Sequence, residues 1–370
     1  MIALPRTDRT LLGAWWWSVD RVLLASIAGL ALVGTILIFA ASPPVSERIY
    51  GDGGRFIVKH LLFLGPALSL LLAVSLLAPR GVLRLAVMML GLFLLLLVLT
   101  LFLGQEVKGA RRWLSLAGMQ IQPSEFVKPA LAVVCAYLLA RREGLQGAPE
   151  ATVLVGVVLL VIVQQPDLGM VAVIAFVAGL QLFVAGLAWP WLVALGGLAA
   201  LGAVQAYLVW PHFQQRVDSF LDPASVGYQV EQALRAVAAG GMLGRGPGEG
   251  RTKFLLPDAH ADFIFAATAE EFGVLVCLLL LALFAFVVLR GLWGVQRAAD
   301  RFTQLAAVGL IGQIGIQAVI NMAVNLNLVP TKGMTLPFIS YGGSSLLALA
   351  IGAGILLALT RRNARLEIDR

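Results

Sequence analysis

Ten long apolar segments run through the sequence, and they constrain the fold more than any other feature. Most of them reach or exceed the roughly 20 residues that a helix needs to cross the hydrocarbon core of a bilayer. Hydrophobic residues make up 60% of the chain and charged residues 13%, so one water-soluble core could not bury them. We therefore predict an all-α integral membrane protein, a single polytopic domain over residues 1–370 with about ten transmembrane helices. The segments are 22–42, 57–78, 82–103, 124–140, 152–165, 167–187, 190–209, 262–289, 303–328 and 338–360.

The same composition excludes a disordered chain, a disulfide scaffold and a soluble nucleic-acid-binding protein. The net charge of +7 does not indicate nucleic acid as a partner, because the basic residues are scattered over the loops. Cys135 and Cys277 lie within apolar segments without a neighbouring His or Cys, so we expect neither a disulfide nor a metal site. No cleavable signal peptide is expected, since no small-residue cleavage site follows the segment that begins at Val22. Residues 15–17, all tryptophan, suit an interfacial anchor.

The positions of the 27 Lys and Arg residues indicate how the chain crosses the membrane. With the N-terminus inside, fourteen fall on the inner side and thirteen on the outer side, so the count decides little. The pattern decides more, because both termini and every inner loop except 186–189 carry positive charge. We predict a cytoplasmic N-terminal segment (1–21), a large extracytoplasmic loop between the seventh and eighth helices (210–261) and a cytoplasmic tail (361–370).

The short outer loop 104–123 is unusually basic for an extracytoplasmic segment. It holds Lys108, Arg111 and Arg112 next to Trp113. Solvation of a loop explains such charges in general, since long loops cross the membrane largely regardless of charge. For this short loop we favour an anionic ligand at the outer surface, such as a lipid phosphate.

Two polar groups border the next helices. Glu125 and Lys128 are three residues apart, so they share one face of the fourth helix and can form an ion pair. The pair either stabilises a charge in the membrane or presents Lys128 to a phosphate in a polar cavity. Asp167 either caps the sixth helix or orients an Arg or Lys in the same cavity.

The loop 210–261 contains a glycine-rich stretch, Gly240–Gly250, which lacks both the Gly-Lys-Ser/Thr of a P-loop and the preceding strand of a dinucleotide fold. We expect a tight turn there rather than a phosphate cradle. Downstream, Lys253, Asp258 and His260 precede Asp262, and this grouping fits general-base chemistry on a hydroxyl beside a bound phosphate. Asp262 could instead be only a helix cap. Glu270 lies eight residues on, about 12 Å along a helix, too far for a close carboxylate pair.

A further polar stretch follows the ninth helix. Asn321, Asn325 and Asn327 precede residues 330–345, where two prolines bracket many small and polar residues. This pattern predicts a re-entrant or broken start to the tenth helix, which is tolerated only where protein or a polar cavity satisfies the backbone. Close helix packing through small residues is the alternative explanation.

Together these motifs resemble the SEDS family of shape, elongation, division and sporulation proteins. The matching stretches are 109–113, 122–128, 165–169, 227–229, 256–271 and 330–345. Residues 330–333 and 244–248 are more similar to the division member of the family than to the elongation member. Ala261 departs from the family, which usually has Thr there, and so removes a hydroxyl beside Asp262.

The resemblance implies a peptidoglycan glycosyltransferase that polymerises lipid II at the outer face of the cytoplasmic (inner) membrane, at the division septum. Asp262 would take the proton from the acceptor sugar's 4-hydroxyl, and the product would have inverted stereochemistry. The implied partners are lipid II, the nascent glycan strand, membrane lipids, a class B penicillin-binding transpeptidase and other division proteins. No cofactor is expected, and a divalent cation is left open. The implied substrate-binding residues are Arg112, Trp113, Gln122, Ser124, Glu125, Lys128, Asp167, Lys253, His260, Lys332, Ser340 and Tyr341, with Arg111, Asp258 and Glu270 as secondary candidates.

Two other functions compete with this one. Ten helices, broken segments and intramembrane charges also describe a lipid II flippase or another transporter. Against a transporter, we detect no inverted repeat, and the polar groups lie near the predicted outer surface rather than at the midplane. A non-catalytic scaffold of the division machinery is the third option.

Overall fold

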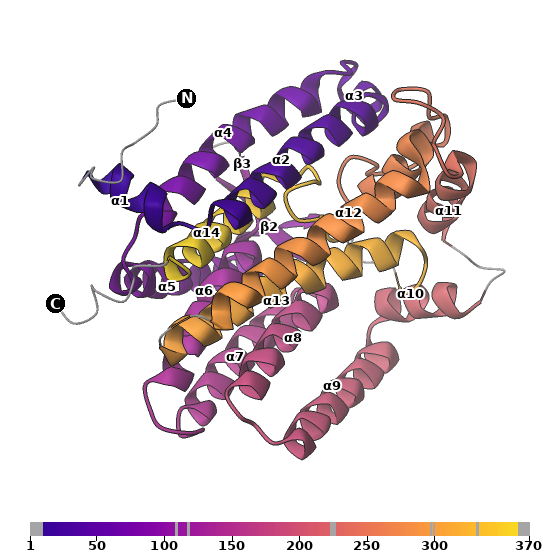
Figure 1. Ribbon diagram of the computed structural model, residues 1–370. Helices are drawn as coiled ribbons and strands as arrows, with labels where there is room; N and C mark the ends of the chain where they lie inside the picture. The colour runs from indigo at the N-terminus through magenta and orange to yellow at the C-terminus, as the bar shows by residue number, and fades with distance from the viewer. Residues whose placement is uncertain are drawn as a thin grey trace.

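The computed structural model of the chain (Figure 1) describes residues 10–107, 110–116, 119–222, 227–296, 298, 300–330 and 333–361. Each of the ten apolar segments contains one helix, so the predicted all-α membrane fold is confirmed. Within the described ranges seven helices are long and apolar enough to cross a membrane, whereas α7, α8 and α14 are shorter, so ten crossings remains a prediction. The ten helices are α2 (Arg21–Ala41), α4 (Arg55–Ser75), α5 (Pro79–Leu103), α6 (Pro123–Ala140), α7 (Ala148–Val163), α8 (Leu168–Val184), α9 (Trp189–Val209), α12 (Ile264–Gln296), α13 (Arg301–Asn325) and α14 (Gly343–Leu359).

The connecting segments have more regular structure than the sequence predicted. Loop 104–123 contains a three-stranded antiparallel sheet in the order β1-β2-β3, in which Gln105 pairs with Trp113 and Leu114 pairs with Ile121. The described residues of the segment 210–261 include two helices and a 3-10 turn. The additional elements are α1 (Leu11–Ser18), α3 (Pro43–Tyr50), β1 (Gln105–Val107), β2 (Ala110–Leu116), β3 (Met119–Ile121), α10 (Pro211–Leu221), α11 (Tyr228–Gly240) and η2 (Thr252–Phe254).

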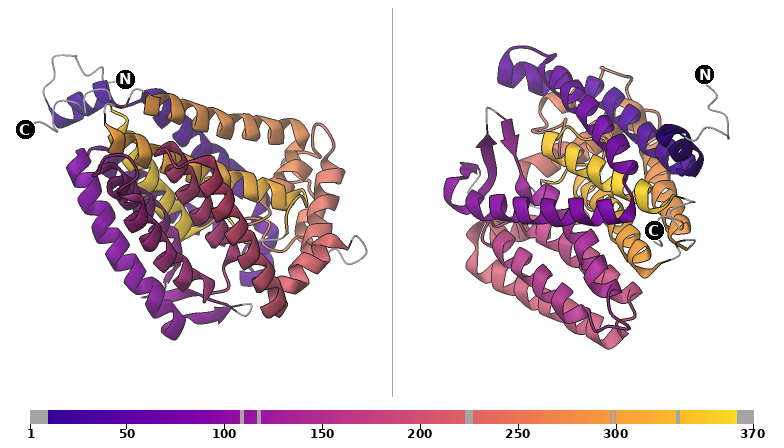
Figure 2. Two further views of the ribbon diagram at one scale, coloured as in Figure 1. Left: turned by 90° about the horizontal axis from the view of Figure 1, so that it is seen from below. Right: turned by 90° about the vertical axis from the view of Figure 1, so that its left-hand side faces the viewer.

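Helix α14 runs through the middle of the bundle (Figure 1 and Figure 2), and nearly all of its residues are buried. Small residues make this possible, since a Cβ at Gly354 would lie 2.7 Å from the carbonyl oxygen of Leu71 in α4. Helix α9 is the opposite case. It lies at the edge of the bundle (Figure 1), and Ala206 is its one buried residue. Its apolar side chains therefore suit contact with lipid rather than a protein core.

Helix α12 is broken at Gly273, whose backbone is in the left-handed region with φ 80°. The glycine-rich segment 240–250 packs against this break. A Cβ at Gly244 would lie 2.2 Å from the carbonyl oxygen of Glu271, and one at Gly273 would lie 2.3 Å from that of Met242. The expected tight turn is confirmed, and its glycines are needed because two backbones approach each other closely.

Candidate active site

The turn that precedes α12 carries Asp262, and amide side chains of α13 hold its backbone. Asn321 Nδ2 donates to the Asp262 carbonyl at 3.0 Å, and Asn325 Nδ2 donates to the same oxygen at 2.9 Å. Asn325 Oδ1 also accepts from the N–H of Ala266 at 3.0 Å. This first-turn N–H of α12 is therefore satisfied by Asn325. The half-buried Asp262 carboxylate lies beside Gly333, where an added Cβ would be 3.0 Å from Oδ2.

The described residues between α13 and α14 form an irregular segment, as the prolines predicted. Residues 336–340 of this segment are buried, and the segment is bonded to the turn that carries Asp262. Tyr341 N–H donates to the His260 carbonyl at 2.9 Å, and Ser340 Oγ donates to the Ala261 carbonyl at 2.6 Å. Ser340 Oγ also accepts from Leu336 N–H at 2.8 Å. Protein groups thus satisfy this backbone. Ser340 and Tyr341 support the turn through these bonds, and the predicted ligand Lys332 lies outside the described residues.

The imidazole of His260 is packed among aromatic rings. Its centroid is 4.0 Å from that of Phe56 in α4 and 5.4 Å from that of Tyr341. Burial lowers the pKa of His260 to about 4; the Asp258 charge opposes this shift and the Arg48 charge adds to it. The ring is therefore neutral at neutral pH and supplies no cation. Its Nδ1 has no hydrogen-bond partner within the described part of the chain.

A second cluster joins the small sheet to the turn before α8. Arg112 Nε lies 3.7 Å from Asp167 Oδ2, and an Arg112 Nη donates to the Pro166 carbonyl at 2.5 Å. Asp167 Oδ1 also accepts from Met170 N–H at 3.1 Å. Asp167 therefore caps α8 and also lies within ion-pair distance of Arg112. Trp113 follows on the same strand and is half-buried.

Arg216 in α10 is a neighbour of this cluster that the sequence did not reveal. The pKa of its guanidinium is lowered by partial desolvation and then by the charge of Arg112, while Asp167 opposes the shift. The charges of two guanidinium groups and one carboxylate therefore act on one another, which leaves a net positive charge suited to an anion. Only the tertiary fold brings α10 to this position.

Lys128 forms the predicted ion pair, 2.9 Å from Glu125, and both side chains are buried. Its ammonium also donates to Gln317 Oε1 at 3.0 Å. The cavity that it borders is lined mainly by apolar side chains, with Gln181 and Gln313 as the other polar members. This geometry is at odds with a polar phosphate cavity at Lys128. It agrees with the alternative, in which the ion pair with Glu125 stabilises a charge within the membrane.

The other members of the predicted set near α6 and in the sheet have supporting contacts. Gln122 N–H donates to Ser344 Oγ in α14 at 3.1 Å, and Ser124 is buried in the first turn of α6. Arg111 is exposed and lies 3.6 Å from Glu106. Asp258 adopts a left-handed backbone, φ 54°, within the turn that leads to Asp262.

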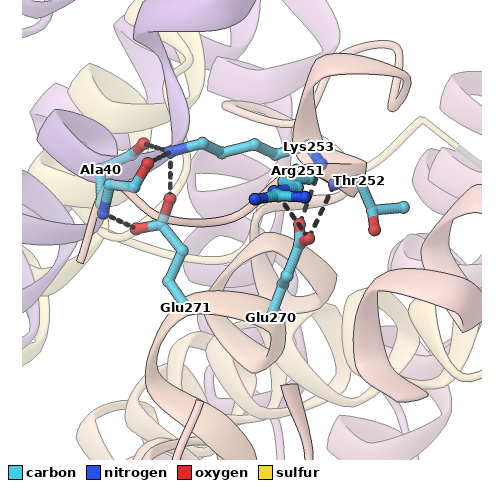
Figure 3. A network of polar contacts seen from close by, with 7 residues as sticks. Ala40, Arg251, Thr252, Lys253, Glu270 and Glu271 are labelled. Carbon is cyan, nitrogen blue, oxygen red and sulfur yellow. Dashed lines mark hydrogen bonds and ion pairs between the residues drawn. The ribbon is translucent and has the colours of Figure 1, made fainter. Parts of the chain in front are cut away.

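Lys253 and Glu270 belong to a buried network rather than to the Asp262 turn (Figure 3). The Lys253 ammonium donates to the carbonyls of Ala40 at 3.0 Å and Gly248 at 3.2 Å, and it forms an ion pair with Glu271. Three acceptors occupy its three hydrogens. The predicted role of Lys253 in holding a pyrophosphate is thus at odds with its position.

Glu270 anchors the chain on which Lys253 lies. Its carboxylate accepts from the N–H groups of Arg251, Thr252 and Lys253 at 2.7–2.9 Å, and the side chain is fully buried (Figure 3). A buried carboxylate that accepts from three backbone donors is not presented to a substrate. The structure therefore argues against Glu270 as a secondary catalytic candidate. Within the described ranges, no group of three or more His, Cys, Asp or Glu side chains is arranged to hold a metal ion.

The chain belongs to the FtsW/RodA/SpoVE family, described as "Cell cycle protein", which it matches over residues 20–365. The predicted resemblance to the SEDS family is thereby confirmed. Among its relatives is the probable peptidoglycan glycosyltransferase FtsW of Caulobacter vibrioides, 44% identical over 97% of this chain and 94% of the relative. The FtsW of Geobacter sulfurreducens, with the same description, is 36% identical over 93% of this chain and 95% of the relative.

Solved structures with the same architecture agree. A chain from a study titled "Structural coordination of polymerization and crosslinking by a peptidoglycan synthase complex" superposes with a TM-score of 0.81 at 30% identity, covering 95% of this chain and all of the other. The rod shape determining protein RodA of Thermus thermophilus superposes with a TM-score of 0.71 at 29% identity, covering 93% of this chain and 97% of the other.

Proposed function

We propose that this chain is a peptidoglycan glycosyltransferase that polymerises lipid II into glycan strands during septal cell-wall synthesis. One observation carries the proposal beyond family membership. A half-buried carboxylate, Asp262, lies in the turn before α12, where Asn321 and Asn325 of α13 both donate to its backbone carbonyl. A carboxylate on a backbone held in this way is suited to act as the general base of the reaction.

In the proposed reaction, Asp262 accepts the proton of the acceptor sugar's 4-hydroxyl as that oxygen attacks the anomeric carbon of the donor. The bond between the anomeric carbon and the pyrophosphate oxygen breaks, and the lipid pyrophosphate leaves with the bonding electrons. Attack opposite the leaving group inverts the anomeric centre, and the growing chain is the donor. Arg112 and Arg216 bind the pyrophosphate and stabilise the charge that develops on it.

The proposal includes an orientation and a partner. Both termini lie in the cytoplasm, so the 210–261 segment and the Asp262 turn face the outside, where no nucleotide pool exists and the substrate must arrive activated. The likeness to a chain of a peptidoglycan synthase complex supports a class B penicillin-binding transpeptidase as the partner. The FtsW relatives support the division septum as the place of action.

Purified protein, with and without a class B transpeptidase, given labelled lipid II in vesicles tests the activity. We expect glycan chains that a muramidase digests. Movement of lipid II across the bilayer without chains would make the protein a flippase. Neither chains nor movement, with the partner bound, would make it a scaffold.

A further inference from the structure

Four amide side chains stand at intervals of four residues along α13: Gln313, Gln317, Asn321 and Asn325. This spacing puts them on one face that turns slowly around the helix over roughly 18 Å. All four are at most 3% exposed. Burying a primary amide is unfavourable unless its donors and acceptor are bonded, so a row of four in an apolar helix calls for a reason.

Three of these amides, Gln317, Asn321 and Asn325, are bonded to the segments around Asp262. Gln317 Nε2 donates to the Thr335 carbonyl at 3.0 Å while its Oε1 accepts from Lys128. Asn321 Nδ2 donates to the carbonyls of Met334 at 2.6 Å and Asp262 at 3.0 Å. The row therefore connects α6, the 333–336 segment and the turn before α12, three parts that are far apart in the sequence.

Asn325 makes the densest set of bonds. Its Nδ2 donates to the Asp262 carbonyl and to the Asn321 carbonyl, both at 2.9 Å, and its Oδ1 accepts from Ala266 N–H. A planar amide bonded at both ends has little freedom to rotate. Two donors on one carbonyl also fix the peptide plane that carries the Asp262 side chain.

We propose that this row of amides is a positioning device for catalysis, with Asn325 as the principal positioning residue for Asp262. The inference rests on the proposed function and deepens it. Asn325 acts on Asp262 through its backbone carbonyl. Loss of its bonds should let the carboxylate shift, and a displacement of about 1 Å at a reacting group costs on the order of 10² in rate.

Steady-state kinetics of Asn325→Ala with lipid II test the effect on the reaction. We expect kcat to fall about 10- to 100-fold while KM stays within about twofold, because Asn325 does not touch the substrate. The acid limb of the pH profile should also move, since a displaced carboxylate has a different environment. The matched control is Thr268→Val, which removes a buried hydrogen bond of 2.7 Å to the Ile264 carbonyl in α12 without touching Asp262. Equal kcat for the two variants at equal loss of thermal stability would overturn the inference.

A second measurement does not depend on activity. Both native cysteines are buried, so Asp262→Cys would carry the accessible thiol of the chain. We expect Asn325→Ala, in that background, to change the rate of labelling by a charged methanethiosulfonate at least fivefold, and Thr268→Val to leave the rate within about twofold. An unchanged rate with Asn325→Ala overturns the positioning role even if the parent polymerises lipid II. A changed rate with a parent that forms no chains supports the positioning of Asp262 and refutes the proposed function instead.

Discussion

Replacing Asp262 by Asn separates a general base from a helix cap more sharply than any other substitution in this chain. Asn has nearly the same shape and can still accept a hydrogen bond, but it cannot take up a proton. Loss of a general base costs on the order of 10²–10⁴ in rate, which is about 2.7–5.4 kcal/mol of transition-state stabilisation. Loss of a cap costs about 1 kcal/mol of stability.

The control for this substitution is Asp300→Asn at the start of α13. Asp300 is a helix cap whose Oδ1 accepts from Thr303 N–H at 2.8 Å, and it has no part in the proposed reaction. We expect Asp262→Asn to abolish measurable glycan polymerisation at normal abundance and normal partner binding, and Asp300→Asn to retain it. The assay is the length distribution of glycan chains made from labelled lipid II at equal protein amounts.

Chain formation by Asp262→Asn within a few-fold of the parent would refute the reasoning. The base would then have to be Asp258, since Glu270 is occupied by three backbone donors. The Asp258→Asn variant would test that alternative directly.

Three further predictions follow from the geometry. Arg216→Ala should raise the KM for lipid II about tenfold or more, the worth of one charge-assisted contact, whereas Arg235→Ala, which removes an exposed ion pair with Glu231, should not. Burial lowers the pKa of His260 from its ordinary value of 6.5 to about 4 in the folded protein, so the unfolded chain binds the proton first and thermal stability should fall as pH drops from about 6.5 to 4; His260→Gln should flatten that decline, and an unchanged slope would contradict it. A reporter active only in the cytoplasm, fused after Gly250, should be silent, and a bright signal would reverse the proposed orientation.

Several predicted site residues serve the fold in ways that sequence spacing could not reveal. Lys253 lies nine residues before Asp262, yet its ammonium is directed to Ala40 and Glu271, in α2 and α12. Chain proximity places two backbones near each other but does not choose the direction of a long side chain. That direction depends on which acceptors the packed helices present.

The amides of α13 form a periodic pattern that is present in the sequence. Asn321 and Asn325 lie next to the broken segment, and Gln313 and Gln317 continue the same four-residue spacing toward the start of the helix. Periodicity alone predicts that the four share a face. Their bonds to Met334, Thr335 and Asp262 depend on the packing of α13 against segments that lie elsewhere in the chain.

The sequence by itself determined the membrane class, the ten apolar helices and the broken segment before α14, because the length and composition of a helix in lipid follow from the thickness and polarity of the bilayer. The family was predictable as well, because its motifs are local stretches of sequence. It also identified Asp262 as a candidate, since an acid at a helix start among polar neighbours is a local pattern. Only the tertiary structure decided which charges meet. In the folded chain the charge of Arg112 acts on Arg216, Lys253 forms an ion pair with Glu271, and Asn325 binds the backbone carbonyl of Asp262. Inside a membrane protein a polar side chain must find its partner on another helix, and that choice is made by packing rather than by neighbours in the chain.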